Sequence, residues 1–188
     1  TATISLNGEE EIKGRISGRE GRKVRAFGMA TGVTVLIDDT PNTVVLSGID
    51  PIKRDIARGS MSRLVKDGRI HPTRIEEVVS KVTEENEYNL ANVGEEAAQR
   101  AGVGTLSQDV LSVLGKLRYR SSYSQNVLAH SVEVAHLMGL LAAEMGLDVS
   151  KAKRIGLLHD IGKTMSEEAE GPHAIVAVSD IHRMRLPL

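Results

Sequence analysis

The sequence predicts an α+β domain followed by an all-α region, on three observations. Strand-like runs of alternating or branched residues occur only before residue 48. Two helix-like segments follow the first of these runs and a third helix-like segment follows the last, so the order is βααββα. From Pro72 onward the apolar residues recur at helical spacing. We therefore expect a three-stranded antiparallel sheet packed on helices, and then helices alone.

Each element of the first domain has its own signal. The expected strands are residues 1–6, 33–37 and 43–47, and the expected helices are residues 11–17, 22–31 and 51–67. Gly32 and Gly68 end the second and third helices, and Pro51 suits the first position of a helix. Gly59 lies inside the third helix and is a local conflict, because it costs about 1 kcal/mol relative to alanine.

The remaining helices follow from spacing and polarity. Ile75, Val78, Val79 and Val82 share one helical face, and the polar residues 84–92 are typical of an exposed helical linker. Further helices are expected at residues 108–118, 124–145 and 150–159, and from residue 173 onward. The chain thus divides into a first domain at 1–70, a helical linker at 71–106 and a second domain at 107–188.

Composition restricts the kind of protein. Aromatic residues make up only 2% of the chain and hydrophobic residues 40%, so the core must be aliphatic. Cysteine is absent, which excludes disulfides and thiolate metal ligands, so a metal would need histidine and carboxylate. No apolar run reaches the roughly 18 residues of a membrane helix, and no signal peptide opens the chain. We expect a cytoplasmic chain that makes no membrane contact itself. The sequence begins at Thr1 without an initiator methionine, so we expect it to be a piece of a longer protein.

A glycine loop joins the first two helices. Gly18 and Gly21 lack the Cβ atoms that would hold a phosphate chain away, and the second helix begins there with its free N–H groups. Six cations and one acid surround the loop, a local charge of about +5. They are Lys13, Arg15, Arg19, Arg22, Lys23, Arg25 and Glu20. Two spaced glycines alone are also typical of a plain turn, but the element order and the charge favour RNA or single-stranded DNA.

This first segment resembles a KH domain. The resemblance implies that about four nucleotides are clamped over the loop without stacking aromatics. The implied RNA-binding residues are Arg15, Gly18, Arg19, Glu20, Gly21, Arg22, Lys23 and Arg25. Ser17 precedes Gly18 where the family usually has an aliphatic residue, which implies weaker packing beneath the loop or weaker affinity.

The most specific motif is Leu-Leu-His-Asp-Ile-Gly-Lys at residues 157–163. Adjacent His159 and Asp160 after a buried helix can both reach one metal ion, or bridge two. His130, on an earlier amphipathic helix, and His173, just after the motif, are further candidate ligands. These contexts predict a divalent metal site for Mg, Mn or Zn, whereas a His-Asp pair by itself would be typical of a helix cap.

Other histidines are weaker candidates. His136 lies six residues after His130, about 120° around the helix, so both cannot point at one ion. We expect it to be structural or on the surface. His71 precedes Pro72 and is expected to be structural, and His182 has no interpretable context.

The histidine–aspartate pattern resembles the HD phosphohydrolase superfamily. The resemblance implies one or two divalent metals that activate water against a phosphoester. It also implies catalytic roles for His159, Asp160 and Lys163, with Lys163 binding phosphate as a point charge.

A KH domain before an HD domain resembles the ribonuclease Y family. The matching phrases run from Gly14 to Arg22, from Thr31 to Pro41, from Asp67 to Pro72 and from Tyr119 to His136. The resemblance implies a metal-dependent endoribonuclease that cuts single-stranded RNA and initiates bacterial mRNA decay. It further implies partners in an RNA-degradation complex and a full-length protein anchored at the inner face of the cell membrane. We expect a dimer for a separate reason, because helical linkers such as residues 72–100 often pair.

The chain differs from that family because several of the family's segments are missing from it. The family's membrane helix and coiled coil are absent, and its HD domain continues further and supplies a distal Asp ligand, for which Asp180 comes too soon. We expect weak nuclease activity or none, and oligomerisation through exposed apolar faces. Two alternatives stay open. One is an RNA-binding KH protein with a structural HD remnant. The other is an HD phosphodiesterase of small cyclic nucleotides, which would not need the glycine loop.

Overall fold

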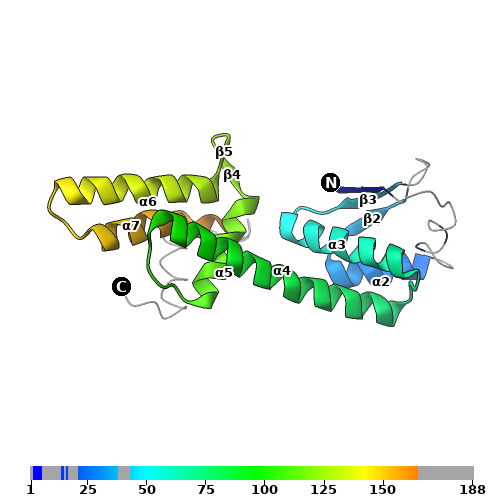
Figure 1. The fold of residues 1–188 in the computed structure, drawn as a ribbon. Coiled ribbons are helices and arrows are strands. Elements are labelled where there is room, and N and C mark those ends of the chain that lie inside the picture. The colour runs from blue at the N-terminus through cyan, green and yellow to red at the C-terminus, as the bar shows by residue number, and fades with distance from the viewer. Residues whose placement is uncertain (1, 6–13, 15, 17–20, 38–42, 165–188) are drawn as a thin grey trace. The chain divides into compact units, whose positions relative to one another are not determined.

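The computed structural model describes residues 2–5, 14, 16, 21–37 and 43–164. Its contacts divide the chain into two compact units, Thr1–Asn86 and Glu87–Leu188, and each unit is described by itself (Figure 1). The finer limits of 1–70, 71–106 and 107–188 stay predictions. The mostly helical architecture with small antiparallel sheets agrees with the α+β class expected.

The first unit is built on a sheet of three strands. They are β1 (Ala2–Ser5), β2 (Thr34–Leu36) and β3 (Thr43–Ser47), in the order β1-β3-β2 with both pairings antiparallel. Val44 and Leu46 of β3 are fully buried, whereas the residues between them are half-buried. This period of two places one face of β3 on the core.

Helices α2 (Arg22–Thr31) and α3 (Pro51–Asp67) pack on this sheet and on each other. Their ends are those predicted, because Gly32 and Gly68 adopt left-handed φ values of +68° and +69°. Asp50 caps α3 through a carboxylate oxygen that accepts a hydrogen bond from the Ile52 N–H at 2.8 Å. Of the first helix expected, only residues 14 and 16 are described, and both are helical.

The glycine inside α3 has a packing reason. A Cβ atom on Gly59 would lie 3.3 Å from Cγ1 of Val82 on the neighbouring helix α4 (Pro72–Ala101). Close approach of the two helices therefore offsets the low helix propensity of glycine. Val82 belongs to the core of the first unit, together with Phe27, Met61 and Leu64.

Helix α4 contributes buried residues to both units. Ile75, Val78, Val79 and Val82 are buried in the first, as their spacing predicted. The expectation that residues 84–92 are an exposed linker needs correction, because Leu90 and Ala91 are only 2% exposed. The cause is helix α5 (Gln108–Lys116), whose Gly115 backs directly onto the Leu90 carbonyl with no room for a Cβ.

The second unit is helical except for one small hairpin. After α5 come a 3-10 turn (Leu117–Tyr119), strands β4 (Ser121–Ser122) and β5 (Gln125–Asn126), helices α6 (Val127–Glu144) and α7 (Val149–Leu158), and a second 3-10 turn (Ile161–Thr164). The helix expected from residue 124 thus begins three residues later. The hairpin replaces its first turn, and Figure 1 shows it projecting at the start of α6.

Helix α6 is central to this unit. Its buried residues include Val127, Val132 and Ala135, which join Leu114, Leu117 and Leu157 in one cluster. Over 18 residues its mean hydropathy reaches 1.2, so among the described helices it alone is long and apolar enough to cross a membrane. A buried core helix passes the same test, so this is weak evidence for a membrane span.

Candidate metal centre

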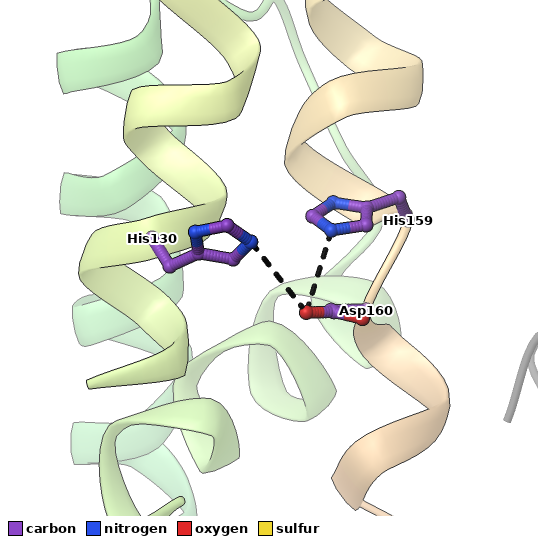
Figure 2. Close-up of side chains that lie close together, drawn as sticks. All are labelled: His130, His159 and Asp160. Carbon is purple, nitrogen blue, oxygen red and sulfur yellow. Dashed lines mark ion pairs between the residues drawn. The ribbon is translucent and has the colours of Figure 1, made fainter. Parts of the chain in front are cut away.

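Three candidate ligands converge where α6 begins and α7 ends (Figure 2). His130 lies on the first turn of α6, which is fixed by Asn126. The Asn126 side-chain oxygen accepts hydrogen bonds from Leu128 N–H at 3.1 Å and Ala129 N–H at 3.3 Å. His159 and Asp160 follow directly after α7. A helix start and a helix end therefore position the three side chains.

The donor atoms of these three residues lie close together. Asp160 Oδ2 is 3.3 Å from His159 Nε2 and 3.9 Å from His130 Nε2. All three donor atoms lie within 4.8 Å of one another, and the imidazole centroids are 5.4 Å apart in an edge-to-face arrangement. Two imidazole nitrogens and one carboxylate oxygen are a donor set that holds divalent transition metals. This His/His/Asp group could bind such an ion.

One hydrogen bond orients the His159 ring. Its Nδ1 lies 2.7 Å from the Gly156 carbonyl oxygen. A carbonyl can only accept, so Nδ1 carries the proton, and in the neutral ring Nε2 keeps its lone pair. A backbone hydrogen bond on the far nitrogen is the usual way in which proteins orient a metal-binding histidine. His159 therefore presents Nε2 toward Asp160 in the form that a metal requires.

Lys163 also belongs to this cluster. Its ammonium donates a hydrogen bond to Asp160 Oδ2 at 2.8 Å, and the Lys163 side chain is 26% exposed. The Asp160 side chain is the most buried of the group at 14% exposed. In this geometry Lys163 neutralises the carboxylate, whereas the sequence led us to expect a contact with phosphate. A cation at Asp160 would compete for the same oxygen and release the lysine.

A depression of about 300 Å³ opens over these side chains. Its lining combines the cluster with the hairpin that precedes α6: Ser122, Tyr123, Gln125, Val127, His130, His159, Asp160 and Lys163. The volume is at the lower end of the range for small-molecule sites. The hairpin residues were missed by the sequence analysis. Their one signal was the polar run Ser-Ser-Tyr-Ser-Gln-Asn, which carries no helical apolar spacing.

The other histidines lie elsewhere. His136 is exposed on α6 and does not join the cluster, in line with its spacing from His130. His71 accepts a hydrogen bond from Arg74 N–H at 3.3 Å through Nδ1, at the start of α4, which is a structural role. His173 lies outside the described residues, and so does His182.

Only part of the glycine loop can be described. Gly21 has a left-handed φ of +67° and directly precedes α2, so the helix begins where it was predicted. Arg22 and Arg25 are exposed on that helix and Lys23 is half-buried. The remaining predicted members of this site, Arg15, Gly18, Arg19 and Glu20, lie outside the described residues.

Comparisons with known proteins agree with these features. The HD domain family model matches residues 127–188, the segment that contains all three clustered side chains. Ribonuclease Y of Protochlamydia amoebophila is 59% identical over 167 residues, 89% of this chain and 32% of that protein. The resemblance to the ribonuclease Y family is confirmed. Ribonuclease Y of Nitratidesulfovibrio vulgaris is 53% identical over 176 residues, 94% of this chain and 34% of that protein.

The matches to ribonuclease Y cover nearly all of this chain but only about a third of each relative. A third ribonuclease Y, from Desulforamulus reducens, is 54% identical over 170 residues, 90% of this chain and 33% of that protein. The chain therefore spans about a third of the length of the curated relatives it matches. No solved structure matches the chain.

Proposed function

We propose that this chain is a metal-dependent phosphodiesterase of the ribonuclease Y type that cleaves single-stranded RNA internally. The observation that carries the proposal is the convergence of His130, His159 and Asp160 in one open depression. The similarity to ribonuclease Y supports RNA as the substrate, and the HD family match supports hydrolysis. Cleavage of this kind would initiate mRNA decay.

The metal would be held by the two imidazoles and the Asp160 carboxylate. Bound there, a divalent cation supplies positive charge to a phosphate and makes water more acidic. The imidazoles suit zinc and the carboxylate suits manganese or magnesium, so the set fits all three metals of the sequence prediction. His173 stays a proposed further ligand.

The chain's own residues would perform the other steps. The Gly156 carbonyl keeps the proton of His159 on Nδ1, away from the metal side of the ring. Lys163, released from Asp160, would place its ammonium against a phosphate oxygen of the RNA. The depression over the cluster would hold the nucleotide at the scissile bond. Among the described residues the cluster contains one carboxylate, and weak activity stays a prediction.

The first unit would hold the RNA as a KH domain. Support comes from the sheet order β1-β3-β2, from helix α2, and from Gly21 at its start. Arg22, Lys23 and Arg25, with the loop residues before them, would contact the phosphates.

We propose a homodimer as well, supported by exposed apolar side chains on α6 such as Leu137 and Leu141. The cytoplasmic location, and partners in an RNA-degradation complex, remain proposals of the same kind.

The test is cleavage of an end-labelled single-stranded RNA of about 20 nucleotides by the full chain in Mn²⁺. We expect slow internal cleavage that Asp160→Asn abolishes. His136→Ala is the matched control, because His136 is exposed on α6 outside the cluster. Cleavage that survives Asp160→Asn would contradict the proposal. Faster hydrolysis of a cyclic dinucleotide, unaffected by Gly21→Asp, would favour the small-nucleotide alternative.

A further inference from the structure

The most exposed aromatic side chain of the described residues stands at the rim of the metal cluster. Tyr123 is 100% exposed, yet it lines the same depression as His130, His159 and Asp160. Aromatic residues are scarce here, with three tyrosines, one phenylalanine and no tryptophan in 188 residues. A fully exposed side chain contributes little to the core, so the informative observation is that this one lines the depression over the cluster.

The backbone holds Tyr123 there under strain. The two-residue turn between β4 and β5 consists of Tyr123 and Ser124, with φ values of +51° and +64°. Turns with two positive φ values are ordinarily built from Asn-Gly or Gly-Gly, because a Cβ is disfavoured in this region. A bulky tyrosine at such a position is an outlier. Strain of this kind clusters at ligand-binding sites.

The hairpin is also fixed to the helix that carries His130. Asn126 donates a hydrogen bond from its side-chain nitrogen to the Arg118 carbonyl at 2.8 Å while its oxygen caps α6. Val127 N–H donates to the Arg120 carbonyl at 3.1 Å. One asparagine thus ties the base of the hairpin to the first turn of α6. The tip is consequently positioned relative to the cluster and does not depend on a free loop.

The charge of the segment that precedes the hairpin favours a polyanion. Between Asp109 and Glu133 the sequence contains no acid, but it contains Lys116, Arg118 and Arg120 on the segment that leads into β4. Basic residues close in sequence to an exposed aromatic residue are typical of segments that bind single-stranded nucleic acid. The cations meet the backbone, and the ring stacks on a base whatever its identity.

We propose that Tyr123 is a substrate-positioning residue whose ring stacks on a nucleobase next to the phosphate held at the His130–His159–Asp160 cluster. This inference rests on the proposed function, since it requires RNA in the depression. Duplex RNA does not offer an unpaired base, so the stack would select single-stranded substrates. It would also fix the register of the chain, because one base must lie on the ring while its phosphate lies at the cluster.

The test uses a fluorescent reporter at the position itself. The chain has no tryptophan, so Tyr123→Trp gives the full chain a single tryptophan as reporter. The probe is a tetranucleotide of adenosine in Mg²⁺, compared with the same ribose–phosphate chain without bases. We expect saturable quenching by the adenosine probe, with affinity about 5- to 100-fold above that for the abasic chain, as one base–aromatic stack predicts. Equal affinity, or no quenching, would overturn the inference.

Two controls keep the result specific. Tyr88→Trp places the emitter on α4 at an exposed tyrosine that does not line the depression, and its emission should not respond. In a Gly21→Asp background, chosen to weaken binding by the first unit, Tyr123→Phe should bind the adenosine probe like Tyr123 itself. Tyr123→Ala should bind about 5- to 100-fold more weakly, and unchanged affinity in that variant would count against the stack. If the chain does not cleave RNA in Mn²⁺, the proposed function is contradicted. If the adenosine and abasic probes quench the tryptophan with equal affinity, this inference is contradicted.

Discussion

Gly156 of α7 lies directly against the backbone of Ala135 in α6. A Cβ atom on Gly156 would be 2.8 Å from Ala135 Cα, closer than real Cβ atoms approach, and 3.0 Å from Ala135 N. The same glycine accepts the hydrogen bond from His159 that orients its ring. One residue therefore sets both the spacing of the two helices and the direction of a metal donor.

Gly156→Ala should consequently damage fold and site together. The added methyl forces α7 away from α6, and overpacking of this kind costs about 1–3 kcal/mol of unfolding free energy. Because His159 and His130 sit on the two separated elements, Mn²⁺ affinity should fall as well. Urea unfolding and titration calorimetry measure the two effects. Gly104→Ala is the matched control, since a Cβ there meets open space, and an equal loss in both variants would refute this role of Gly156.

Ser124→Gly should stabilise the protein. Ser124 has a φ of +64°, where a side chain costs about 1–2 kcal/mol, and the greater freedom of glycine in the unfolded chain takes back part of that gain. We expect a net rise of about 0.5–1 kcal/mol in the free energy of unfolding. Ser121→Gly, in the extended part of the hairpin, should lower it slightly. Thermal unfolding of both variants decides this, and a destabilised Ser124→Gly would show that the turn is not strained.

Gly21→Asp should weaken RNA binding more than Gly32→Asp. Both glycines flank α2 with φ values near +67°, so both substitutions carry the same backbone strain. Only Gly21 stands at the helix start, where a carboxylate would repel phosphate. Fluorescence anisotropy of a labelled single-stranded RNA at low salt should show at least about tenfold weaker binding for Gly21→Asp, as one charge-assisted contact predicts. Equal RNA affinities of Gly21→Asp and Gly32→Asp would contradict a role of the first unit in RNA binding.

Asp67 should make stability depend on pH at the junction of α3 and α4. Arg69, and then Arg74, donate hydrogen bonds to its carboxylate and hold the pKa of Asp67 below its ordinary value of 3.8. A lowered pKa stabilises the folded chain above the unfolded pKa, and this contribution is lost as the pH falls through the folded pKa. Asp67→Asn should therefore be less stable than the parent at pH 7, and the difference in unfolding free energy should shrink as the pH falls below about 4. Glu76→Gln, at an exposed site, should show no such gap; a gap that persists in acid would contradict the assignment.

Local signals in the sequence predicted much of the fold. Pro51, Gly32 and Gly68 mark helix ends through their own backbone preferences, and these ends agree with α2 and α3. The adjacent pair His159 and Asp160 pointed to the metal cluster because their residue types are the donors themselves.

The missed features depend on tertiary contacts. The sequence around Gly156 does not predict its close contact with the Ala135 backbone, because Ala135 lies on another helix. The β4–β5 hairpin was missed because its turn is Tyr123-Ser124 and lacks the Asn-Gly pair that ordinarily marks one. Leu90 sits in a polar stretch, and only the approach of α5 buries it.

The central claim is that His130, from a separate helix, completes a metal site with His159 and Asp160. Titration calorimetry of the full chain with Mn²⁺ tests it most directly, with His130→Ala compared with His136→Ala on the same helix. We predict one binding site that His136→Ala preserves and His130→Ala weakens at least about tenfold, a loss of 1.4 kcal/mol or more. Equal Mn²⁺ affinity in the two variants would contradict the account.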